Sequence, residues 1–325
     1  MNSLVPIIVS ASRSTDIPYF YAKWFINRLR LGYCVGYNPF NRKPYKVSFE
    51  KTKVVVFWSK NPKPIIPYLK ELDDIGIHYY FQFTLNDYEQ ENLEPNVARL
   101  SDRIDTFKSL SELIGKQKVI WRFDPLILTD KININKLLDK IQFVGDKIHN
   151  YTDKLVFSFA DIDNYKKVKN NLRRDNINYK NWSNEDMENI AKSIMQINKQ
   201  WNLKVATCAE NIDLDSFSIE HNRCIDGELM KNIFCEDKAL IYYLNYGKLP
   251  EKNVLFIDSV LQSININRFK DNGQRKACGC MISKDIGMYN TCMHFCEYCY
   301  ANTSKAAVMK NMSLFKDINE SIIKF

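Results

Sequence analysis

The sequence predicts an α/β fold, because short apolar runs of β type alternate with helix-like stretches through the first two thirds of the chain. The runs are rich in Val, Ile, Phe, Tyr and Trp, and most end in a polar or charged residue where a loop is expected to begin. Such alternation forms a parallel sheet with right-handed crossovers, as either an open doubly wound sheet or a barrel. We expect strands at residues 7–12, 54–59, 79–85, 119–125, 155–161 and 204–210.

Helix-like stretches lie around and between these strands. Ser183 or Asn184 is a good N-cap for the last helix, which carries acidic residues in its first turn, and Gly115 is placed to close the third. No expected strand is followed by a G-x-G-x-x-G or G-x-x-x-x-G-K-S/T loop, which argues against a dinucleotide or NTP enzyme. The expected helices are residues 19–32, 62–76, 96–115, 134–149 and 183–201.

The alternation of strands and helices stops near residue 211. Residues 211–283 are turn-rich and polar around a helical middle, so we expect an insertion that packs across one end of a barrel. A seventh strand is expected at residues 285–290 and a last helix from about residue 304. The chain is therefore expected to form one domain, residues 1–325, that contains this insertion.

Composition is that of a globular protein, with 45% hydrophobic and 26% charged residues. The net charge of +8 suits a nucleic-acid partner, but abundant Lys and Asn also follow from an AT-rich genome, and the basic run 166–174 is equally a solvated helix surface. No run reaches the roughly eighteen apolar residues of a membrane span and no basic leader is present, so we expect no membrane partner and a cytoplasmic location. In that reducing compartment, nine cysteines favour metal binding or catalysis over disulfides.

Three cysteines near the C-terminus, Cys292, Cys296 and Cys299, are spaced C-x3-C-x2-C. Thiolate is the soft ligand that iron and zinc centres select. A structural zinc ion needs four ligands, whereas a cubane cluster held by three cysteines leaves one iron open for a further ligand. His294 or a distant cysteine is an alternative fourth ligand for zinc, and His294 could equally orient a ligand through a hydrogen bond.

The stretch from Cys292 to Cys299, with Tyr298 before the last cysteine, resembles the cluster motif of the radical S-adenosylmethionine (SAM) superfamily. The longer string YNTCMHFCEYCYAN is most similar to the version in the spore photoproduct lyase branch. Over nearly its full length the chain resembles a bacterial family with such a cluster at its C-terminus, through the segments SASRSTDIP, FWSKNP, FQFT, WRFDP, TCAE, CIDGE and CGC.

The resemblance implies a radical SAM enzyme in which Cys292, Cys296 and Cys299 ligate a 4Fe–4S cluster whose open iron chelates SAM. One electron from a reductant such as flavodoxin or ferredoxin then cleaves SAM to methionine and a 5′-deoxyadenosyl radical, which abstracts a hydrogen atom from a substrate. Tyr298 matches the aromatic position beside the adenine of SAM. The motif does not identify the substrate, although the net charge and the lyase branch suggest a nucleic acid.

The resemblance also implies a partial (β/α)6–7 TIM-like barrel that is circularly permuted, because the superfamily's cluster loop follows the first barrel strand and here it follows the last strand in sequence. Residues 285–290 would then be the first barrel strand and residues 7–12 the second. The end of the second strand would hold SAM through Ser12, Arg13, Thr15 and Asp16. Other candidates lie near the carboxyl ends of strands, where barrel enzymes place their chemistry: Gln82, Thr84, Arg122, Asp124 and Glu210.

Two of these candidates have an alternative role. Arg122 could clamp the SAM carboxylate and Asp124 could bond the ribose hydroxyls, since a guanidinium binds carboxylate in a fork. An Arg-x-Asp pair at a strand end could equally be a structural ion pair.

Four further cysteines lie at the two ends of the insertion: Cys208, Cys224, Cys278 and Cys280. If residues 285–290 pair into the sheet, both ends of the insertion come to the barrel mouth and the four thiolates could meet. We expect a second metal centre there, an auxiliary iron–sulfur cluster or a structural zinc ion. Cys34 and Cys235 are expected to be ordinary buried thiols.

Two other functions use the same residues. One is a metal-stabilised protein, with zinc or an iron–sulfur cluster, whose basic surface binds nucleic acid. The other is an iron–sulfur electron-transfer protein that does not cleave SAM. The sequence shows no RNA-binding module and no basic stripe interleaved with aromatic residues, which weakens the first of these.

Overall fold

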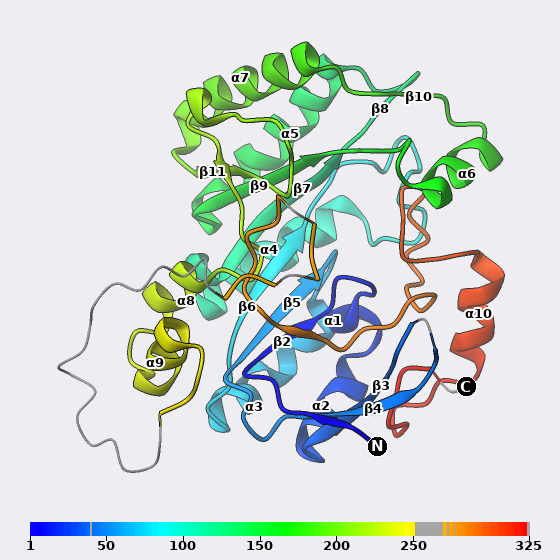
Figure 1. The fold of residues 1–325 in the computed structure, drawn as a ribbon. Coiled ribbons are helices and arrows are strands. Elements are labelled where there is room, and N and C mark those ends of the chain that lie inside the picture. Colours follow the sequence, from blue (N-terminus) through cyan, green and yellow to red (C-terminus); the bar gives the residue numbers. More distant parts are fainter. Residues whose placement is uncertain (40, 251–268, 272, 276, 324–325) are drawn as a thin grey trace.

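A parallel sheet of eight strands runs through the molecule (Figure 1). The computed structural model describes residues 1–39, 41–250, 269–271, 273–275 and 277–323. All neighbouring strands of this sheet are parallel. In spatial order they are β13 (Lys284–Asp285), β2 (Ile8–Ala11), β5 (Val54–Ser59), β6 (His78–Thr84), β7 (Val119–Leu126), β9 (Lys154–Phe159), β11 (Lys204–Thr207) and β12 (Glu220–His221).

The six strands expected from the apolar runs are all present, so the α/β fold is confirmed. From β2 to β12 the spatial order follows the chain order without reversal, whereas a doubly wound sheet reverses at a switch point. The doubly wound alternative is therefore excluded. In the part of the chain that the structure describes, β13 and β12 are the two edges and the sheet does not close on itself.

Helices connect the strands, and two of the expected caps are present. Ser183 Oγ accepts a hydrogen bond from Asp186 N at 3.1 Å, and Gly115 ends its helix with φ of 92°. The expected helix 19–32 is divided at Tyr21, and 62–76 begins as a 3₁₀ helix. The α-helices before the insertion are α1 (Ile17–Phe20), α2 (Ala22–Arg30), α3 (Leu69–Asp74), α4 (Leu100–Ile114), α5 (Ile134–Ile148), α6 (Lys166–Arg174) and α7 (Asn184–Trp201). Those after residue 211 are α8 (Gly227–Ile233), α9 (Lys238–Tyr246) and α10 (Lys305–Ser313), and the 3₁₀ helices are η1 (Lys63–Tyr68), η2 (Lys116–Lys118), η3 (His149–Tyr151) and η4 (Asp215–Phe217).

One face of the sheet packs against the connecting helices. Alternate strand residues such as Phe57, Phe81 and Trp121 point into this core and meet Phe25 of α2 and Leu110 of α4. Because the strand order never reverses, successive crossovers lie on the same side of the sheet. The opposite face is thereby left for other parts of the chain.

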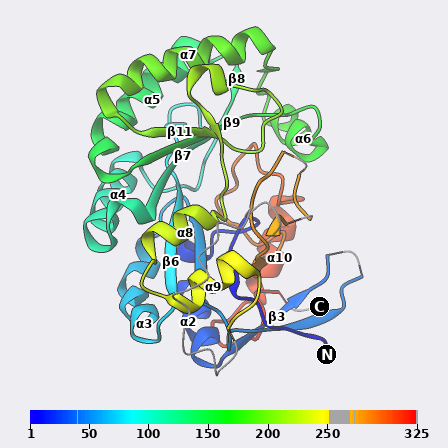
Figure 2. The same ribbon diagram turned by 60° about the vertical axis from the view of Figure 1, so that its left-hand side comes forward.

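The insertion covers that opposite face (Figure 2). Ile8, Val54 and Tyr80 of the strands pack there with Met230 of α8 and Leu240 of α9. We expected the insertion to lie across one end of a barrel, but its described part packs against the face of the sheet, because α8 and α9 each present an apolar side to the strands. The remainder of the insertion, residues 251–268, lies outside the described residues.

Strand β13 is much shorter than expected. Residues 285–290 were predicted as a strand, but only Lys284 and Asp285 pair with β2, opposite Val9 and Ser10. The ladder stops because the Asp285 carboxylate turns back on the chain and accepts hydrogen bonds from Ser10 Oγ at 2.7 Å, Arg13 N at 2.9 Å and Gly287 N at 2.8 Å.

The two ends of the chain lie close together (Figure 1). Val35 N donates to Glu320 O at 2.8 Å, and Trp24 Nε1 of α2 donates to Asn319 O at 2.9 Å. No described helix is long and apolar enough to cross a membrane. The remaining strands form two small sheets: β1 (Ser3–Leu4), β4 (Pro44–Ser48) and β3 (Tyr33–Tyr37) in one, β8 (Leu128–Thr129) and β10 (Tyr179–Lys180) in the other.

Gly287 allows the chain after β13 to approach the end of β2, which gives a first prediction. A Cβ at position 287 would lie 1.8 Å from Ser12 Oγ and 2.5 Å from Ser12 Cβ. Gly287→Ala is therefore expected to lower the free energy of unfolding by about 1–3 kcal/mol through overpacking. Urea unfolding followed by tryptophan fluorescence measures the change.

Two further variants control for this prediction. Ser12→Gly combined with Gly287→Ala removes the nearest colliding side chain and leaves Ser14 Oγ 2.8 Å from the added Cβ, so the pair should recover part of the lost stability. Gly273→Ala, where the nearest atom to the added Cβ would be 3.2 Å away, should change stability by less than about 0.5 kcal/mol. Wild-type stability of the single Gly287→Ala protein would contradict the close approach.

Candidate functional site

The cysteine loop, residues 286–303, begins directly after β13 and is held by side chains from distant parts of the chain. Tyr21 Oη donates to Thr291 O at 2.5 Å, and Asn302 Nδ2 donates to Cys292 O at 2.8 Å. Cys299 N donates to Cys296 O at 3.0 Å, which curls the last two cysteines into a turn. The loop is thus compact although it contains no regular element.

The three cysteines of the loop are close neighbours. Burial raises the pKa of each thiol, that of Cys292 to about 12, and the charges of Cys292 and Cys299 raise that of Cys296 further. The ammonium of Lys60 acts in the opposite direction on Cys296 and Cys299. The thiols therefore stay protonated unless a cation or a metal compensates the thiolate charge.

The donor set is compatible with a 4Fe–4S cluster. Among the described residues no three His, Cys, Asp or Glu side chains are placed to hold one metal ion. In a cubane each cysteine binds a different iron, so the three sulfurs need not converge on one point. The loop is therefore compatible with a cluster of this kind.

His294 does not complete a zinc site in this structure. Its Nε2 lies 2.8 Å from Asp16 Oδ2, and its Nδ1 lies 3.4 Å from Asn96 O. The ring also packs against Tyr19 and Phe20. Both ring nitrogens are therefore occupied, and His294 orients the loop.

Asp16 fixes the loop to the end of two strands. Its Oδ1 caps α1 by accepting from Tyr19 N at 3.0 Å, and its Oδ2 accepts from Lys60 N at 2.8 Å besides the contact with His294. We predicted that Asp16 would hold SAM, but its oxygens are engaged in these internal contacts. Asp16 thus joins the start of α1, the residue after β5 and the cysteine loop.

Tyr298 takes part in a buried network of charges beside the cysteines. Its hydroxyl donates to Glu94 Oε1 and accepts from Lys60 Nζ at 2.9 Å and Asn86 Nδ2 at 3.0 Å. Lys60 Nζ also lies 2.6 Å from Glu94 Oε1, and Arg103 Nη1 lies 3.6 Å from Glu94 Oε2. Burial disfavours the Glu94 carboxylate, but Lys60 and Arg103 outweigh burial and lower its pKa to about 2.

Arg122 forms the ion pair that was the alternative to a SAM contact. It bonds the Asp124 carboxylate through Nε and Nη2, and its Nη1 lies 3.1 Å from Gln82 Oε1. The same Nη1 lies 3.1 Å from Cys224 Sγ, so Arg122 faces the second cysteine set. Asp124 also accepts from Ser158 Oγ.

The other predicted residues lie at the same edge of the sheet, in different surroundings. Ser12 is buried, and its Oγ lies 3.1 Å from Ser14 Oγ. Thr15 is buried near Tyr21. Arg13 stacks on Trp58 with 5.1 Å between its guanidinium carbon and the ring centre. Their positions follow from β2, whose carboxyl end they extend.

Thr84 and Glu210 are half-buried at the ends of β6 and after β11. Glu210 Oε1 accepts from Phe159 N at 3.0 Å, and burial raises its pKa to about 7. Among the candidates that extend from strands, these two are less enclosed than Arg122 or Gln82. They are the better placed for contact with a ligand.

Sequence analysis missed Lys60, Glu94 and Asn86. Lys60 directly follows β5, so the rule that selected Arg122 and Asp124 at a strand end could have selected it. Glu94 and Asn86 lie in the loop between β6 and α4, where no periodic pattern exists. The prediction that Cys235 is buried was wrong, because it follows α8 at the surface, whereas Cys34 is buried as expected.

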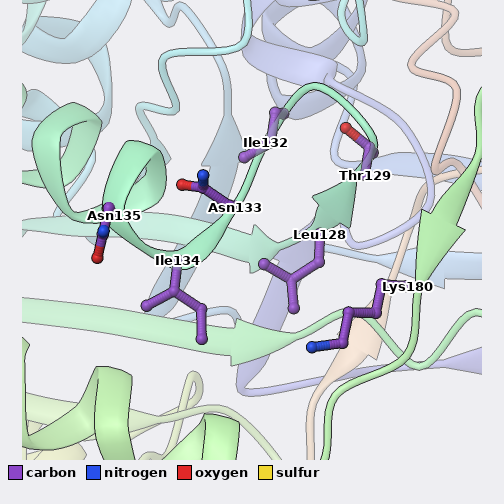
Figure 3. Close-up of a pocket in the computed structure, with 7 residues that line it drawn as sticks. All are labelled: Leu128, Thr129, Ile132, Asn133, Ile134, Asn135 and Lys180. Atoms are coloured by element: carbon purple, nitrogen blue, oxygen red, sulfur yellow. The ribbon is translucent and has the colours of Figure 1, made fainter.

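A separate pocket lies away from these residues. It has a volume of 290 Å³ and is lined by the β8 strand, the start of α5 and Lys180 (Figure 3). A much smaller space of 20 Å³, about the size of one water molecule, borders the cysteine loop. Its lining residues are Asn171, Arg174, Phe295, Cys296, Glu297, Cys299, Asn302, Ser304 and Lys305.

Comparison with known proteins places the chain in a family. A family described as "Domain of unknown function (DUF1848)" matches residues 8–301. The chain belongs to this family. The matched range contains every strand of the eight-stranded sheet and both cysteine sets.

No curated protein matches the chain. Among solved structures, a putative alpha-L-fucosidase from Bacteroides thetaiotaomicron is similar to it, with 9% identity and a TM-score of 0.25 over 56% of this chain and 71% of that chain. A TM-score this low carries no argument about the fold or function of the DUF1848 chain.

The buried carboxylate of Glu94 gives a second prediction for this DUF1848 protein. Glu94→Gln is expected to lower the free energy of unfolding at neutral pH by about 3 kcal/mol, because Lys60 and Arg103 would stay buried without their anion. The folded pKa of about 2 lies below the unfolded value of about 4.3, so this stabilisation is present above the unfolded pKa and is lost as pH falls through the folded pKa.

Urea unfolding at a series of pH values measures both effects. The stability difference between wild type and Glu94→Gln should shrink steadily from about pH 5 towards pH 2. Glu50→Gln, at an exposed carboxylate, is the control and should differ from wild type by less than about 0.5 kcal/mol at any pH. A pH-independent difference for Glu94→Gln would show that its charge is not the stabilising feature.

Proposed function

We propose that this protein is a radical SAM enzyme whose cysteine loop holds a 4Fe–4S cluster. The observation that carries the proposal is the position of the loop. Cys292, Cys296 and Cys299 follow β13, the first strand in the spatial order of the sheet, at its carboxyl end. A reactive loop at the carboxyl end of a parallel sheet is where α/β proteins place their chemistry.

The fold that we propose with this function is a circularly permuted partial TIM-like barrel. Three features support it: β13 pairs in parallel beside β2, the strand order then follows the chain without reversal, and the chain ends lie close together. Adjacent ends allow a chain to be cut and rejoined elsewhere with little effect on packing. In this arrangement β13 is the first barrel strand and β2 the second.

The three cysteines would hold the cluster and leave one iron for the amino and carboxylate groups of SAM. When bound, the cluster supplies the electron that cleaves SAM to a 5′-deoxyadenosyl radical, which takes a hydrogen atom from the substrate. The chain's own residues would bind and orient SAM and shield the cluster from water. Tyr298 is held through its hydroxyl by Glu94, and its ring packs against Tyr88, so it would be positioned for a contact with adenine.

The SAM contacts that we propose are at the same edge. Thr84 and Glu210 are half-buried there and could reach a ligand directly. Ser12, Arg13 and Thr15 extend β2 beside the loop. The residues with internal partners, Asp16, Gln82, Arg122 and Asp124, would act by holding this edge in shape.

Basic residues border the loop on its outer side. Arg174 of α6 and Lys305 of α10 both contact the Glu297 carboxylate and line the small space beside Cys296 and Cys299. An acidic electron-transfer protein such as flavodoxin or ferredoxin is the reductant that this border favours. The same border suits a polyanionic substrate, and we propose a nucleic-acid-related substrate on that ground.

The third prediction tests SAM cleavage. Protein reconstituted with iron and sulfide without oxygen should become brown, and with SAM and dithionite it should yield 5′-deoxyadenosine and methionine. Cys292→Ala, Cys296→Ala and Cys299→Ala together should abolish the visible absorbance of this cluster and the product. Absorbance spectra, iron analysis and chromatography of the nucleoside measure these outcomes.

Cys235→Ser is the matched control, because Cys235 is exposed and outside both cysteine sets. It should keep the wild-type iron content and product yield. A brown protein that makes no 5′-deoxyadenosine would favour an electron carrier. A colourless protein that retains only zinc would favour the metal-stabilised binding protein, and either result contradicts the proposal.

A further inference from the structure

Four cysteines that are far apart in sequence meet on the face of the sheet covered by the insertion. Cys208 follows β11, Cys224 follows β12, and Cys278 and Cys280 precede β13. Cys208 Sγ lies 3.5 Å from Cys224 Sγ. Cys280 in turn contacts both Cys224 and Cys278 through its sulfur. The four sulfurs thus form a continuous row of neighbours.

Several hydrogen-bond donors surround these sulfurs. Cys280 Sγ accepts from two backbone amides, Cys224 N at 3.2 Å and Ile225 N at 3.4 Å. Cys224 Sγ accepts from Asn222 Nδ2 at 3.4 Å and from Arg122 Nη1 at 3.1 Å. Sulfur of a neutral thiol is a weak acceptor, so this number of donors is more useful to a charged thiolate.

Two guanidiniums, the buried one of Arg122 and the half-buried one of Arg13, face the row from the sheet side. Arg122 lies against Cys224 and Cys208, and Arg13 lies against Cys280 and Cys224. Arg13 Nη2 is buried and has no hydrogen-bond partner in the residues that the structure describes. The charge of Arg13 is compensated in part by the Asp285 carboxylate, and its Nη2 remains available as a further donor beside the sulfurs.

The distance between Cys208 Sγ and Cys224 Sγ fits a pair of ligands on a single tetrahedral ion. With zinc–sulfur bonds of about 2.3 Å, the edge of a tetrahedron is about 3.8 Å, close to the 3.5 Å between Cys208 and Cys224. Sulfurs that bind separate irons of a cubane lie farther apart. A disulfide needs about 2.05 Å, and all four cysteines are free thiols. The described residues do not yet surround one point, so binding would draw the ends of the row together.

We propose that Cys208, Cys224, Cys278 and Cys280 form a tetrathiolate site for one zinc ion, distinct from the three-cysteine loop. Four cysteines leave no open position, so the site is structural. It joins the strand before the insertion to the strand after it, and so it fastens the insertion to the sheet. Binding displaces the thiol protons to water, and the bond energy stabilises the folded chain.

The experiment measures metal content independently of SAM cleavage. Protein with Cys292→Ala, Cys296→Ala and Cys299→Ala is produced with zinc and iron present and analysed by inductively coupled plasma mass spectrometry. We expect about one zinc per chain and no iron or sulfide. Adding Cys278→Ser and Cys280→Ser to this variant should remove the zinc, whereas adding Cys235→Ser should leave it.

A second measurement keeps the test valid if the combined variant misfolds. Wild-type protein is stripped of metal and titrated with Co²⁺. The absorption bands of a tetrahedral tetrathiolate, both thiolate charge-transfer and ligand-field, should appear and stop growing when the four cysteines have bound one ion. Zinc should displace the cobalt and raise the melting temperature. Absence of zinc from the first variant, several irons with sulfide in its place, or octahedral cobalt spectra would each overturn the proposal. None of these results depends on whether the protein cleaves SAM.

Discussion

The parallel pairing of β13 with β2 is the constraint on which both cysteine sets depend. The pairing involves only two residues on each strand, so the ladder alone is weak. Asp285 reinforces it by accepting from Ser10, Arg13 and Gly287, and charge-assisted bonds of this kind are worth about 1.5–3 kcal/mol each. One carboxylate therefore carries much of the connection between the end of the chain and its beginning.

A continuous polar network then relates the two cysteine sets. Arg122 bonds Cys224 on one side and Asp124 on the other, and Asn86 bonds both the Asp124 main chain and the Tyr298 hydroxyl beside Cys299. Buried charges are costly unless each is paired, so the members of the network fix one another in place.

The sequence predicted the elements that depend on a local pattern of residues. It did not predict features that depend on contacts with side chains far away in the chain. The six strands were predicted because burial on both sides of a parallel sheet requires continuous apolar runs such as residues 54–59. The length of β13 was not, since the carboxylate of Asp285 and not strand propensity ends it. The role of Asp16 was likewise hidden, because its partners Lys60 and His294 are far away in the chain.

The two cysteine sets differ in what surrounds them, and the difference suggests a division of labour. The set around Cys224 has four sulfurs, backbone amide donors and two guanidiniums, and it is sealed between the sheet and the insertion. The loop has three cysteines, the ammonium of Lys60 beside Cys296, and a small space beside Cys296 and Cys299. A saturated set holds its metal and cannot bind a further ligand, whereas an incomplete set must bind one. If both proposals hold, stabilising the fold and carrying out chemistry would fall to separate cysteines of one chain.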